Sequence, residues 1–390
     1  MKKVLSTCLA VALAVSCSPR LYNVTESYPD SHFEELQAIV DNPSTPKDVR
    51  FYYTEASSLG LGGKMFNDTP NPYHRIDTVI YKGMTKGELF QATCSAGLNV
   101  TFSTNSSAIA VKTKWGKLWS SNSTMPIAYR GYDLYIKDVQ GKWKWAAAGA
   151  PRMDKSEDEL VLIKNLPEGT KECLLYLPIY QEILSCKIGI VEGSGIHPLP
   201  GQFRGRILFH GSSYTHGIST SRAGMSYPKQ FERATGLQVL GFGMSGNSKL
   251  QPYFAAVLAD ADADAYVFDT FSNPDWKTIK ERLVPFIDTL IAAHPGKPLI
   301  FQQTIYRQGR NFNTVNEARE KAKQDMASTI FDSLLKDPKY KDVYFIRTDA
   351  DGGSHEYSVD GTHPDDHGYY LWYKSIEKPI LTILAKYGIR

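Results

Sequence analysis

Two patterns of apolar and polar positions divide the chain. From residue 49 to about residue 191, short segments alternate apolar and polar residues with a period of two, which is typical of half-buried β-strands. These segments are 98–102, 108–114, 132–137, 159–163, 172–177 and 186–191. Turn signals separate them, and no helical pattern is evident between them. Many short strands without intervening helices predict a β-sandwich of the jelly-roll type.

The downstream half alternates short apolar runs with helical patterns. The apolar runs are 207–209, 239–242, 265–268, 299–302 and 343–346. Apolar residues recur at helical spacing in 276–294 and 317–335, and a last helix is predicted after Pro364. This alternation predicts an α/β domain with three layers, in which helices cover both faces of a doubly wound parallel sheet.

The change of pattern also sets the expected domain limits. We assign 48–195 to the β-sandwich domain and 205–390 to the α/β domain, with a connecting linker at 193–205. Residues 18–47 are polar and interrupted by prolines, so they are expected to form a tether, with one short helix at 33–40.

The first seventeen residues are expected to be a signal peptide rather than part of the fold. Two lysines precede an apolar run at 4–15, which is too short to span a bilayer. The run ends in Ala14-Val15-Ser16-Cys17, which resembles a bacterial lipobox. Cleavage there would leave Cys17 as a lipidated N-terminus and anchor a cell-envelope lipoprotein to the membrane. The alternative to a lipobox is an ordinary secretory signal with a chance cysteine. Because no acidic stretch follows Cys17, a periplasmic orientation of the lipoprotein is favoured.

Composition and charge narrow the classes of partner. The chain has 42% hydrophobic and 22% charged residues, which is typical of a folded protein, and its net charge of +3 gives no reason to expect a nucleic-acid partner. Beyond the signal peptide and Cys17, the cysteines are Cys94, Cys173 and Cys186, so at most one disulfide can form. A Cys173–Cys186 bond is compatible with an oxidising compartment, but sequence does not determine the pairing. No Cys/His spacing suggests a metal site, no cofactor is expected, and the oligomeric state is not indicated.

Four polar loops follow predicted strands and carry the candidate chemistry. They contain Gly211-Ser212-Ser213, then 243–247, 269–273 and 359–364. In a doubly wound sheet, loops at the carboxyl ends of the strands meet at one edge, where such sheets bind ligands. A serine, backbone or amide donors and an Asp/His pair are the groups that acyl transfer requires.

On these loops the downstream half resembles an SGNH (GDSL-type) hydrolase. Ser213 matches the family's nucleophile, within Gly-Ser-Ser rather than the commoner Gly-Asp-Ser. Gly246 matches the glycine of the second block and Asn273 the asparagine of the third. The third block departs from the family pattern, since Ser272 and Pro274 replace its usual Gly and Asp.

The remaining motifs extend the resemblance to the last loop and to the upstream β-half. Asp360 and His363 match the family's final Asp-x-x-His block, within Asp-Gly-Thr-His-Pro. Upstream, Gly131-Tyr-Asp-Leu-Tyr135 resembles the Gly-x-Asp-Leu-Tyr signature of a β-domain that precedes a subset of these hydrolases.

The resemblance implies a role for each matched residue. His363 would take the proton of the Ser213 hydroxyl, and Asp360 would orient and stabilise the imidazole. The backbone N–H groups of Ser213 and Gly246 and the side-chain amide of Asn273 would form the oxyanion hole.

Structural alternatives exist for the same residues. Asn273 followed by Pro274 is also a good helix N-cap, and Thr362 or His363 would suit the cap of the last helix. Gly246 would suit an ordinary turn. Arg307 and Arg310 lie in a loop after the fourth strand and could reach a substrate, although exposed arginines commonly have no special role.

The function that the resemblance implies is a serine esterase acting on short-chain acyl esters. O-acetyl groups on carbohydrates are the favoured substrate, because a β-sandwich precedes such domains in carbohydrate esterases and because the chain contains 23 tyrosines, which suit glycans. Lipase, thioesterase and arylesterase activities stay open, as does a non-catalytic glycan-binding envelope protein. The expected partners are therefore a small-molecule or glycan acyl ester and, through Cys17, a membrane.

Overall fold

The computed structural model describes residues 30–152, 157–347 and 355–390. The chain divides into two compact units, Met1–Pro43 and Ser44–Arg390. In the first unit, helix α1 (Asp30–Asp41) is exposed along its length and includes the helix predicted at 33–40. The predicted signal peptide, Cys17 and the tether as far as residue 29 lie outside the described residues. None of the helices in the described ranges is long and apolar enough to cross a bilayer.

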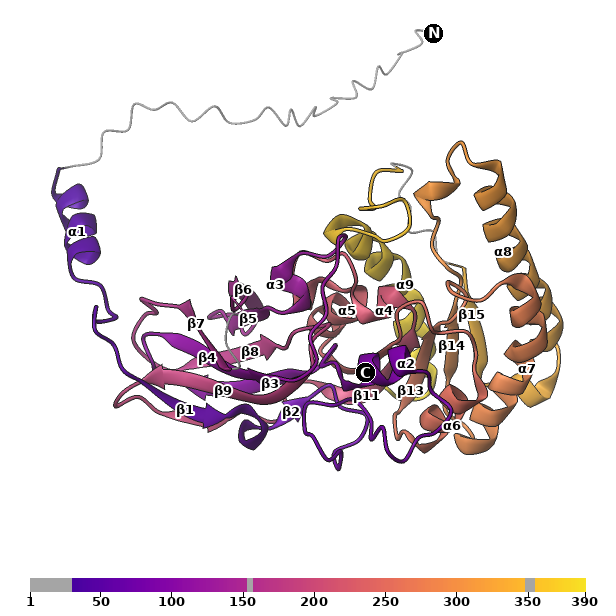
Figure 1. Ribbon diagram of the computed structural model, residues 1–390, viewed down its shortest axis with the longest axis horizontal. Coiled ribbons are helices and arrows are strands. Elements are labelled where there is room, and N and C mark those ends of the chain that lie inside the picture. The colour runs from indigo at the N-terminus through magenta and orange to yellow at the C-terminus, as the bar shows by residue number, and fades with distance from the viewer. Residues whose placement is uncertain (1–29, 153–156, 348–354) are drawn as a thin grey trace, which may run out of the picture. The chain divides into compact units, whose positions relative to one another are not determined.

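The second unit begins with an antiparallel β-sandwich (Figure 1). One sheet has the order β1-β9-β4-β7, and the other has the order β10-β3-β8-β5-β6 with β2 beside β3. The strands are β1 (Phe51–Glu55), β2 (Leu61–Gly62), β3 (Asn99–Thr104), β4 (Ile109–Trp115), β5 (Tyr132–Lys137), β6 (Trp143–Gly149), β7 (Glu157–Ile163), β8 (Lys171–Tyr176), β9 (Ile183–Val191) and β10 (Ile196–Pro198). Phe102 and Leu175 from one sheet share an apolar cluster with Val111 and Ile188 from the other. This confirms the predicted sandwich.

The β-sandwich half also contains helices, which the strand pattern did not predict. They are η1 (Ala56–Leu59), α2 (Lys86–Thr93) and α3 (Pro126–Tyr129). Helix α2 begins with a capping box in which Thr85 and Glu88 accept each other's backbone N–H. Ala92 of this helix packs with residues of the α/β half in one apolar cluster. Strand β10 lies within the predicted linker and pairs with β3, so the sandwich extends into that segment.

The three cysteines of the second unit are buried free thiols. Cys173 lies on β8 and Cys186 on β9, in opposite sheets of the sandwich core. Burial raises the pKa of each of these thiols, and of the Cys94 thiol, to about 12. The disulfide that the sequence left open is therefore not formed.

A five-stranded parallel sheet follows, in the order β12-β11-β13-β14-β15. The strands are β11 (Arg204–Gly211), β12 (Leu237–Gly243), β13 (Ala265–Asp269), β14 (Leu299–Gln302) and β15 (Val343–Ile346). The chain runs outward from β11 in both directions, as in doubly wound folds, so the order reverses beside β11. The carboxyl ends of β11, β12 and β13 then lie where such folds place their ligands.

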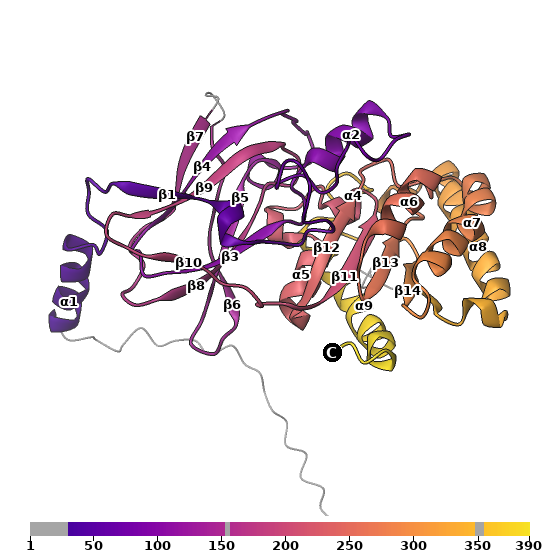
Figure 2. The same ribbon diagram turned by 90° about the horizontal axis from the view of Figure 1, so that it is seen from below.

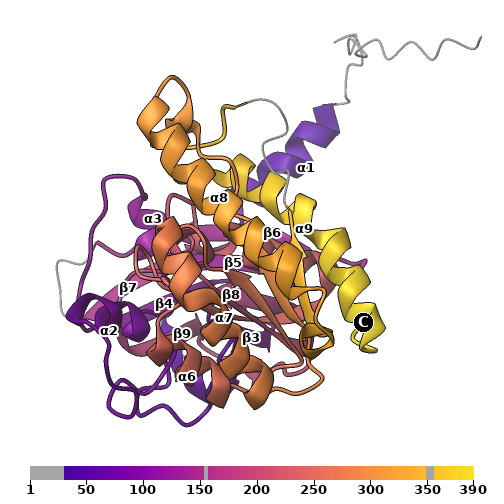
Figure 3. The ribbon, with the colours of Figure 1, turned by 90° about the vertical axis from the view of Figure 1, so that its right-hand side faces the viewer.

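Helices cover both faces of this sheet (Figure 2). They are α4 (Ser213–His216), η2 (Ala223–Met225), α5 (Tyr227–Thr235), α6 (Pro252–Asp260), α7 (Trp276–Ala293), η3 (Gln308–Arg310), α8 (Thr314–Leu334), η4 (Pro338–Tyr340) and α9 (Asp366–Lys386). Figure 3 shows α7 and α8 next to each other over one face. Successive residues of β11 face opposite layers: Leu208 packs with α6 and α7, whereas Ile207 and Phe209 pack with α5 and α9. The predicted three-layer domain is confirmed.

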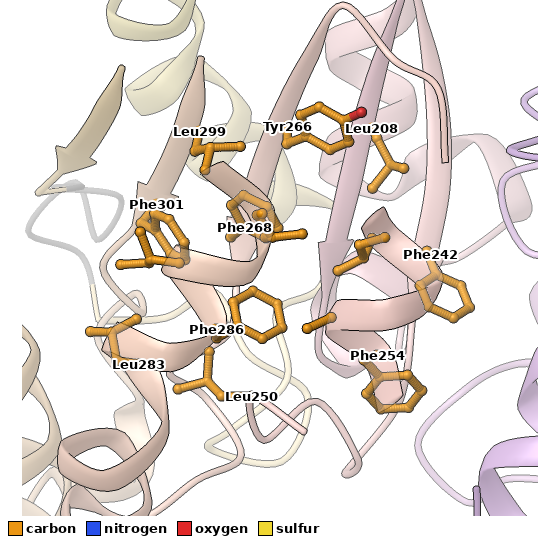
Figure 4. Close-up of a cluster of buried hydrophobic side chains, with 14 of the residues drawn as sticks. Leu208, Phe242, Leu250, Phe254, Tyr266, Phe268, Leu283, Phe286, Leu299 and Phe301 are labelled. Atoms are coloured by element: carbon orange, nitrogen blue, oxygen red, sulfur yellow. The ribbon is translucent and has the colours of Figure 1, made fainter. Parts of the chain in front are cut away.

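The first of these layers is rich in phenylalanine (Figure 4). Phe268 of β13 stacks on Phe301 of β14 with ring centroids 4.5 Å apart, and Phe286 of α7 meets Phe268 edge to face at 5.8 Å. Such aromatic pairs contribute specific geometry in addition to buried area. They hold β13 and β14 in place beneath the loops that carry polar residues.

The Gly131–Tyr135 motif joins the sandwich to the α/β half. Asp133 is fully buried, and its Oδ2 accepts the backbone N–H of Gly224 at 2.9 Å and lies 3.5 Å from Arg222. Burial raises the pKa of Asp133, and Arg222 and the Gly224 N–H partly offset this effect. The aspartate of the motif therefore reaches across to η2 and links the sandwich to the α/β half.

Candidate active site

Ser213 stands at the first turn after β11. Ser212 is the N-cap of α4, and its hydroxyl accepts the N–H of Tyr214 at 3.2 Å. A Cβ at Gly211 would lie 2.3 Å from Thr215 Oγ1 and 2.8 Å from the carbonyl oxygen of Asp269. Only glycine therefore allows this close approach of β11 to its neighbours, and the turn places Ser213 at the carboxyl edge of the sheet.

The structure brings Ser213, His363 and Asp360 together. The Ser213 Oγ lies 3.2 Å from His363 Nε2, and His363 Nδ1 lies 2.8 Å from Asp360 Oδ2. Asp360 Oδ1 also accepts the backbone N–H groups of Thr362 at 3.0 Å and His363 at 2.8 Å. This is the nucleophile, base and orienting-acid order that the three residue types form in serine hydrolases.

The surroundings of Asp360 favour its ionised form. Burial raises the pKa of Asp360, but the hydrogen bonds from the His363 ring and from the His363 and Thr362 backbone outweigh burial. The resulting pKa lies below the usual value, so the group stays a carboxylate throughout the neutral range. A carboxylate at this distance holds a proton on His363 Nδ1 and leaves Nε2 free to accept one from Ser213.

His210 and His216, which are almost completely buried, are poor candidates for a base. Burial lowers the pKa of His210 to about 4 and lowers that of His216 well below its usual value. A ring nitrogen of each lies within hydrogen-bonding distance of a backbone carbonyl, at Phe242 and Ile179 respectively. These side chains are thus part of the packing.

The predicted oxyanion donors lie on loops that are hydrogen-bonded to one another. Asn273 Oδ1 accepts the N–H of Ser248 at 3.2 Å, which leaves its Nδ2 without a partner among the described residues. The N–H groups of Ser213 and Gly246 likewise have no partner within the described ranges. Gly246 has φ +71°, a left-handed conformation that favours glycine, and it is exposed. Three N–H donors are thus available.

The capping alternatives for the site residues are wrong. Asp275 is the N-cap of α7 and accepts the N–H of Thr278 at 2.8 Å, so Asn273 does not cap this helix. Asp365 is the N-cap of α9 and accepts the N–H of Gly368 at 2.8 Å, so neither Thr362 nor His363 does so.

The two arginines singled out from the sequence are held in ion pairs. Arg307 lies 3.0 Å from Glu320 and donates to the Tyr214 hydroxyl at 2.8 Å and to the Ser272 carbonyl at 2.7 Å. Arg310 binds both carboxylate oxygens of Glu317, at 2.6 and 2.9 Å. Their side chains are only 15% and 8% exposed, so the expectation of exposed arginines was wrong.

Sandwich residues hold the loop that carries Gly246. Arg75, fully buried, donates to the Gly243 carbonyl at 2.8 Å, and Gln91 donates to the Ser245 carbonyl at 2.9 Å. The Tyr180 hydroxyl is hydrogen-bonded to the Ser245 hydroxyl, and the Tyr180 ring stacks on His216 with centroids 4.0 Å apart. Sequence reasoning missed these contacts, because nothing in the spacing of residues so far apart along the chain indicates that they meet.

Among the described residues, no group of three or more His, Cys, Asp or Glu side chains could hold a metal ion.

Comparison with known proteins covers both halves. Residues 49–196 match the family described as the N-terminus of SGNH hydrolase-type esterases, and residues 204–381 match the GDSL-like lipase/acylhydrolase family. A crystal structure of a protein designated a GDSL-like lipase, from Bacteroides ovatus ATCC 8483, is 37% identical, with a TM-score of 0.82. The match covers 86% of this chain and 98% of that one.

More distant structures share the fold. The salicylyl-acyltransferase SsfX3 from a tetracycline biosynthetic pathway is 18% identical, with a TM-score of 0.65 over 90% of this chain and 99% of that one. A family two carbohydrate esterase from Cellvibrio japonicus is 11% identical, with a TM-score of 0.56 over 86% of this chain and 98% of that one. A family two carbohydrate esterase from Clostridium thermocellum, solved in complex with cellohexaose, is 12% identical, with a TM-score of 0.54 over 84% and 99%. A search of curated proteins found no match.

The doubly wound fold and these matches define a carboxylic ester hydrolase of the SGNH type, with an antiparallel β-domain in front of it. The chain belongs to the GDSL-like lipase/acylhydrolase family.

Replacing Gly211 with alanine tests the close approach that the nucleophile turn requires. Because the added Cβ meets backbone of Asp269, we expect the free energy of unfolding to fall by about 3 kcal/mol. Gly87→Ala is the matched control: this exposed glycine of α2 has nothing within 4 Å of an added Cβ, and alanine there should leave stability unchanged or slightly higher. Urea unfolding followed by tryptophan fluorescence measures both. Equal stability of Gly211→Ala and the parent would contradict the close approach.

Proposed function

We propose that the chain hydrolyses short-chain acyl esters, and specifically O-acetyl groups on carbohydrates, with Ser213 as the nucleophile. The observation that carries the proposal is the continuous hydrogen-bonded set Ser213 Oγ, His363 and Asp360, with contacts of 3.2 and 2.8 Å. A serine hydroxyl is a weak nucleophile until a base removes its proton, and this geometry supplies the base.

The reaction proceeds in two halves. As Ser213 Oγ attacks the ester carbonyl, its proton passes to His363 Nε2, and Asp360 stabilises the imidazolium through Nδ1. The same Nε2 proton then goes to the departing alcohol oxygen, which leaves an acyl group on Ser213. Water, deprotonated by His363, attacks this acyl-enzyme. The bond between the acyl carbon and Ser213 Oγ then breaks, the acid is released, and the proton on His363 Nε2 returns to Ser213 Oγ. The low pKa of Asp360 keeps the carboxylate ionised through both halves.

The negative oxygen of each tetrahedral intermediate needs donors. We assign this role to the N–H groups of Ser213 and Gly246 and to the Asn273 amide. Support comes from the Ser248 N–H, which occupies Asn273 Oδ1 and so orients the side chain with its Nδ2 free. One such donor contributes about 3 kcal/mol to the stability of a transition state.

The carbohydrate assignment is supported by relatives of the fold. Two of the structures with the same two-part fold are carbohydrate esterases, one of them in complex with cellohexaose. Lipase, thioesterase and arylesterase activities are the alternatives that the test below distinguishes.

Hydrolysis of p-nitrophenyl esters with increasing acyl length tests the nucleophile and the acyl group together. We expect acetate to be hydrolysed faster than octanoate. Ser213→Ala should lower the rate by at least about 10³-fold, because the remaining groups cannot form the acyl-enzyme. It should also abolish labelling by a fluorophosphonate, whereas Ser120→Ala, an exposed serine, keeps both. Faster hydrolysis of octanoate would reject a short-chain esterase, and full activity of Ser213→Ala would reject the mechanism.

The same pair of proteins then identifies the alcohol. Incubation with acetylated xylan, mannan and pectin should release acetate from at least one of them with the parent protein and from none with Ser213→Ala. Release of acetate only from p-nitrophenyl acetate would reject the carbohydrate assignment.

Asn273→Ala tests the oxyanion assignment. We expect kcat for p-nitrophenyl acetate to fall about 10²-fold with little change in KM, because the donor acts on the intermediate rather than on the bound ester. Asn313→Ala is the control, since Asn313 caps the exposed start of α8 and should change stability but not kcat. A change confined to KM would assign Asn273 to ground-state binding instead.

We further propose that Cys17 is lipidated and holds the enzyme at the cell envelope, facing the periplasm. The support is the lipobox-like sequence Ala14-Val15-Ser16-Cys17. In a bacterial host, Cys17→Ala should move the protein from the membrane pellet to the soluble fraction, because a lipid chain is the anchor. A parent protein that is already soluble would contradict this proposal without affecting the esterase assignment.

A further inference from the structure

A second carboxylate lies directly beneath the turn that carries Ser213. Asp269 is the last residue of β13 and is 1% exposed. Its Oδ2 accepts the Ser212 hydroxyl at 2.6 Å and the Ser212 backbone N–H at 3.2 Å, while Oδ1 accepts the Ser272 hydroxyl at 2.9 Å. Thr215 Oγ1 is also within 3.3 Å of Oδ2. None of these contacts is part of the proton path through His363 and Asp360.

These bonds fix the direction of the Ser212 hydroxyl. Since its proton is donated to Asp269, an Oγ lone pair is left to accept the N–H of Tyr214 at 3.2 Å. Ser212 is therefore held at both its backbone and its side chain, and α4 starts at a defined point. Ser213, the first residue of α4, is positioned by the residue immediately before it.

Ser212 occupies the position at which the commoner form of the motif has an acid. In the commoner Gly-Asp-Ser form of the motif an aspartate stands there, and this chain has serine. Gly211 is in register with Asp269 in the pairing of β11 with β13, so the neighbouring strand brings a carboxylate to the same turn. The acid that is absent from the turn itself is present one strand away.

We propose that Asp269, acting through Ser212, is a positioning residue for the nucleophile and supplies from β13 the carboxylate that the motif lacks. This inference rests on the proposed function, because it assigns a role relative to Ser213. Asp269 does not touch the substrate or the reacting atoms in this role.

Burial makes the ionisation of Asp269 sensitive to pH in the mildly acidic range. Burial raises the pKa of Asp269 to about 6, and the hydrogen bonds from Ser212 and Ser272 and the charge of Arg307 oppose this rise. The other titratable groups that face it are the hydroxyls of Tyr214, Tyr227 and Tyr369, whose pKa values are raised by burial, so they stay neutral.

Lys323 and Glu320 of α8 contribute indirectly. Lys323 donates to the Ser272 carbonyl at 3.1 Å, and Glu320 pairs with Arg307 at 3.0 Å.

Protonation of Asp269 would release Ser212. A neutral carboxyl turns one acceptor into a donor, so it can no longer accept all the bonds that it accepts as a carboxylate. Because the raised pKa lies near 6, the ionised form predominates above this pH and is lost as the pH falls through it. Activity should then fall on the acid side as Asp269 loses its ionised form.

The experiment measures kcat and KM for p-nitrophenyl acetate between pH 4.5 and 8. Asp269→Asn should lower kcat about tenfold or more with KM nearly unchanged, and should make the fall of kcat on the acid side less steep than in the parent, because an asparagine side chain does not ionise. Ser212→Ala should have the same two effects, and the double variant should be no worse than either, because both act through one contact. Asp275→Asn is the matched control: its carboxylate caps α7 at the surface, and this variant should keep the parent profile.

Exchanging the two side chains tests the inference by a recovery of kcat rather than by a loss of kcat alone. Ser212→Asp alone places two carboxylates in contact and should lower kcat. Adding Asp269→Ser should raise kcat about tenfold above that of Ser212→Asp, because one carboxylate is again present at the turn.

Several results would overturn the inference. The first is an Asp269→Asn variant whose kcat and acid-side pH profile match those of the parent. The second is a double variant, Asp269→Asn with Ser212→Ala, in which the two losses of kcat add. If Asp269→Asn does not unfold cooperatively, Ser212→Ala decides, and an unchanged profile there counts against the inference. Full activity of Ser213→Ala would instead reject the proposed function itself, so the two failures are distinguishable.

Discussion

The parallel pairing of β11 with both β12 and β13 is the constraint on which the rest of the site depends. Gly211 is in register with Gly243 on one side and with Asp269 on the other, so three strands end at one level. The N–H of Met244 donates to the Gly211 carbonyl at 2.8 Å and closes the edge between the first two loops. A shift of one residue in this pairing would turn Leu208 and Phe209 toward the wrong helical layers. Core packing and site geometry therefore enforce the same register.

The β-sandwich takes part in this constraint. Its buried Arg75 and its partly buried Gln91 bind the end of β12 and the loop that follows it, while the buried Asp133 binds η2 beyond α4. Separating the two halves would leave unpaired donors and acceptors on both. The sandwich is in this sense part of the framework around the loops that carry Ser213 and Gly246.

Hydrophobic periodicity predicted the framework well, since burial on both faces makes parallel strands into continuous apolar runs. The predicted limits of β14 and β15 agree with the observed ones. Alternation identified the sandwich strands β3, β4, β5, β7, β8 and β9, whereas β1, β2, β6 and β10 were missed. Helix α2 was missed because it is short, has few apolar positions, and depends on a capping box and on contacts with the α/β half.

The order and spacing of motifs along the chain identified the candidate site residues, whereas only the structure identified the residues that hold them in place. Asp360 and His363 are three residues apart, so their proximity is local and readable from sequence. The pairing of Ser212 with Asp269 joins residues 57 positions apart on neighbouring strands, and a serine-for-aspartate change in a motif does not reveal where a replacement acid lies. The ion pairs of Arg307 and Arg310 were also not predicted, because they form only when α8 lies beside the loop that carries the two arginines.

The burial of the sandwich thiols has a chemical consequence. Cys173 and Cys186 lie in opposite sheets, and burial raises the pKa of each to about 12, so little thiolate exists at neutral pH. Thiolate is the species that enters thiol–disulfide exchange, so these two side chains react slowly with glutathione and other disulfides while the two sheets cover them. In the folded sandwich they serve as small apolar core groups rather than as a cross-link.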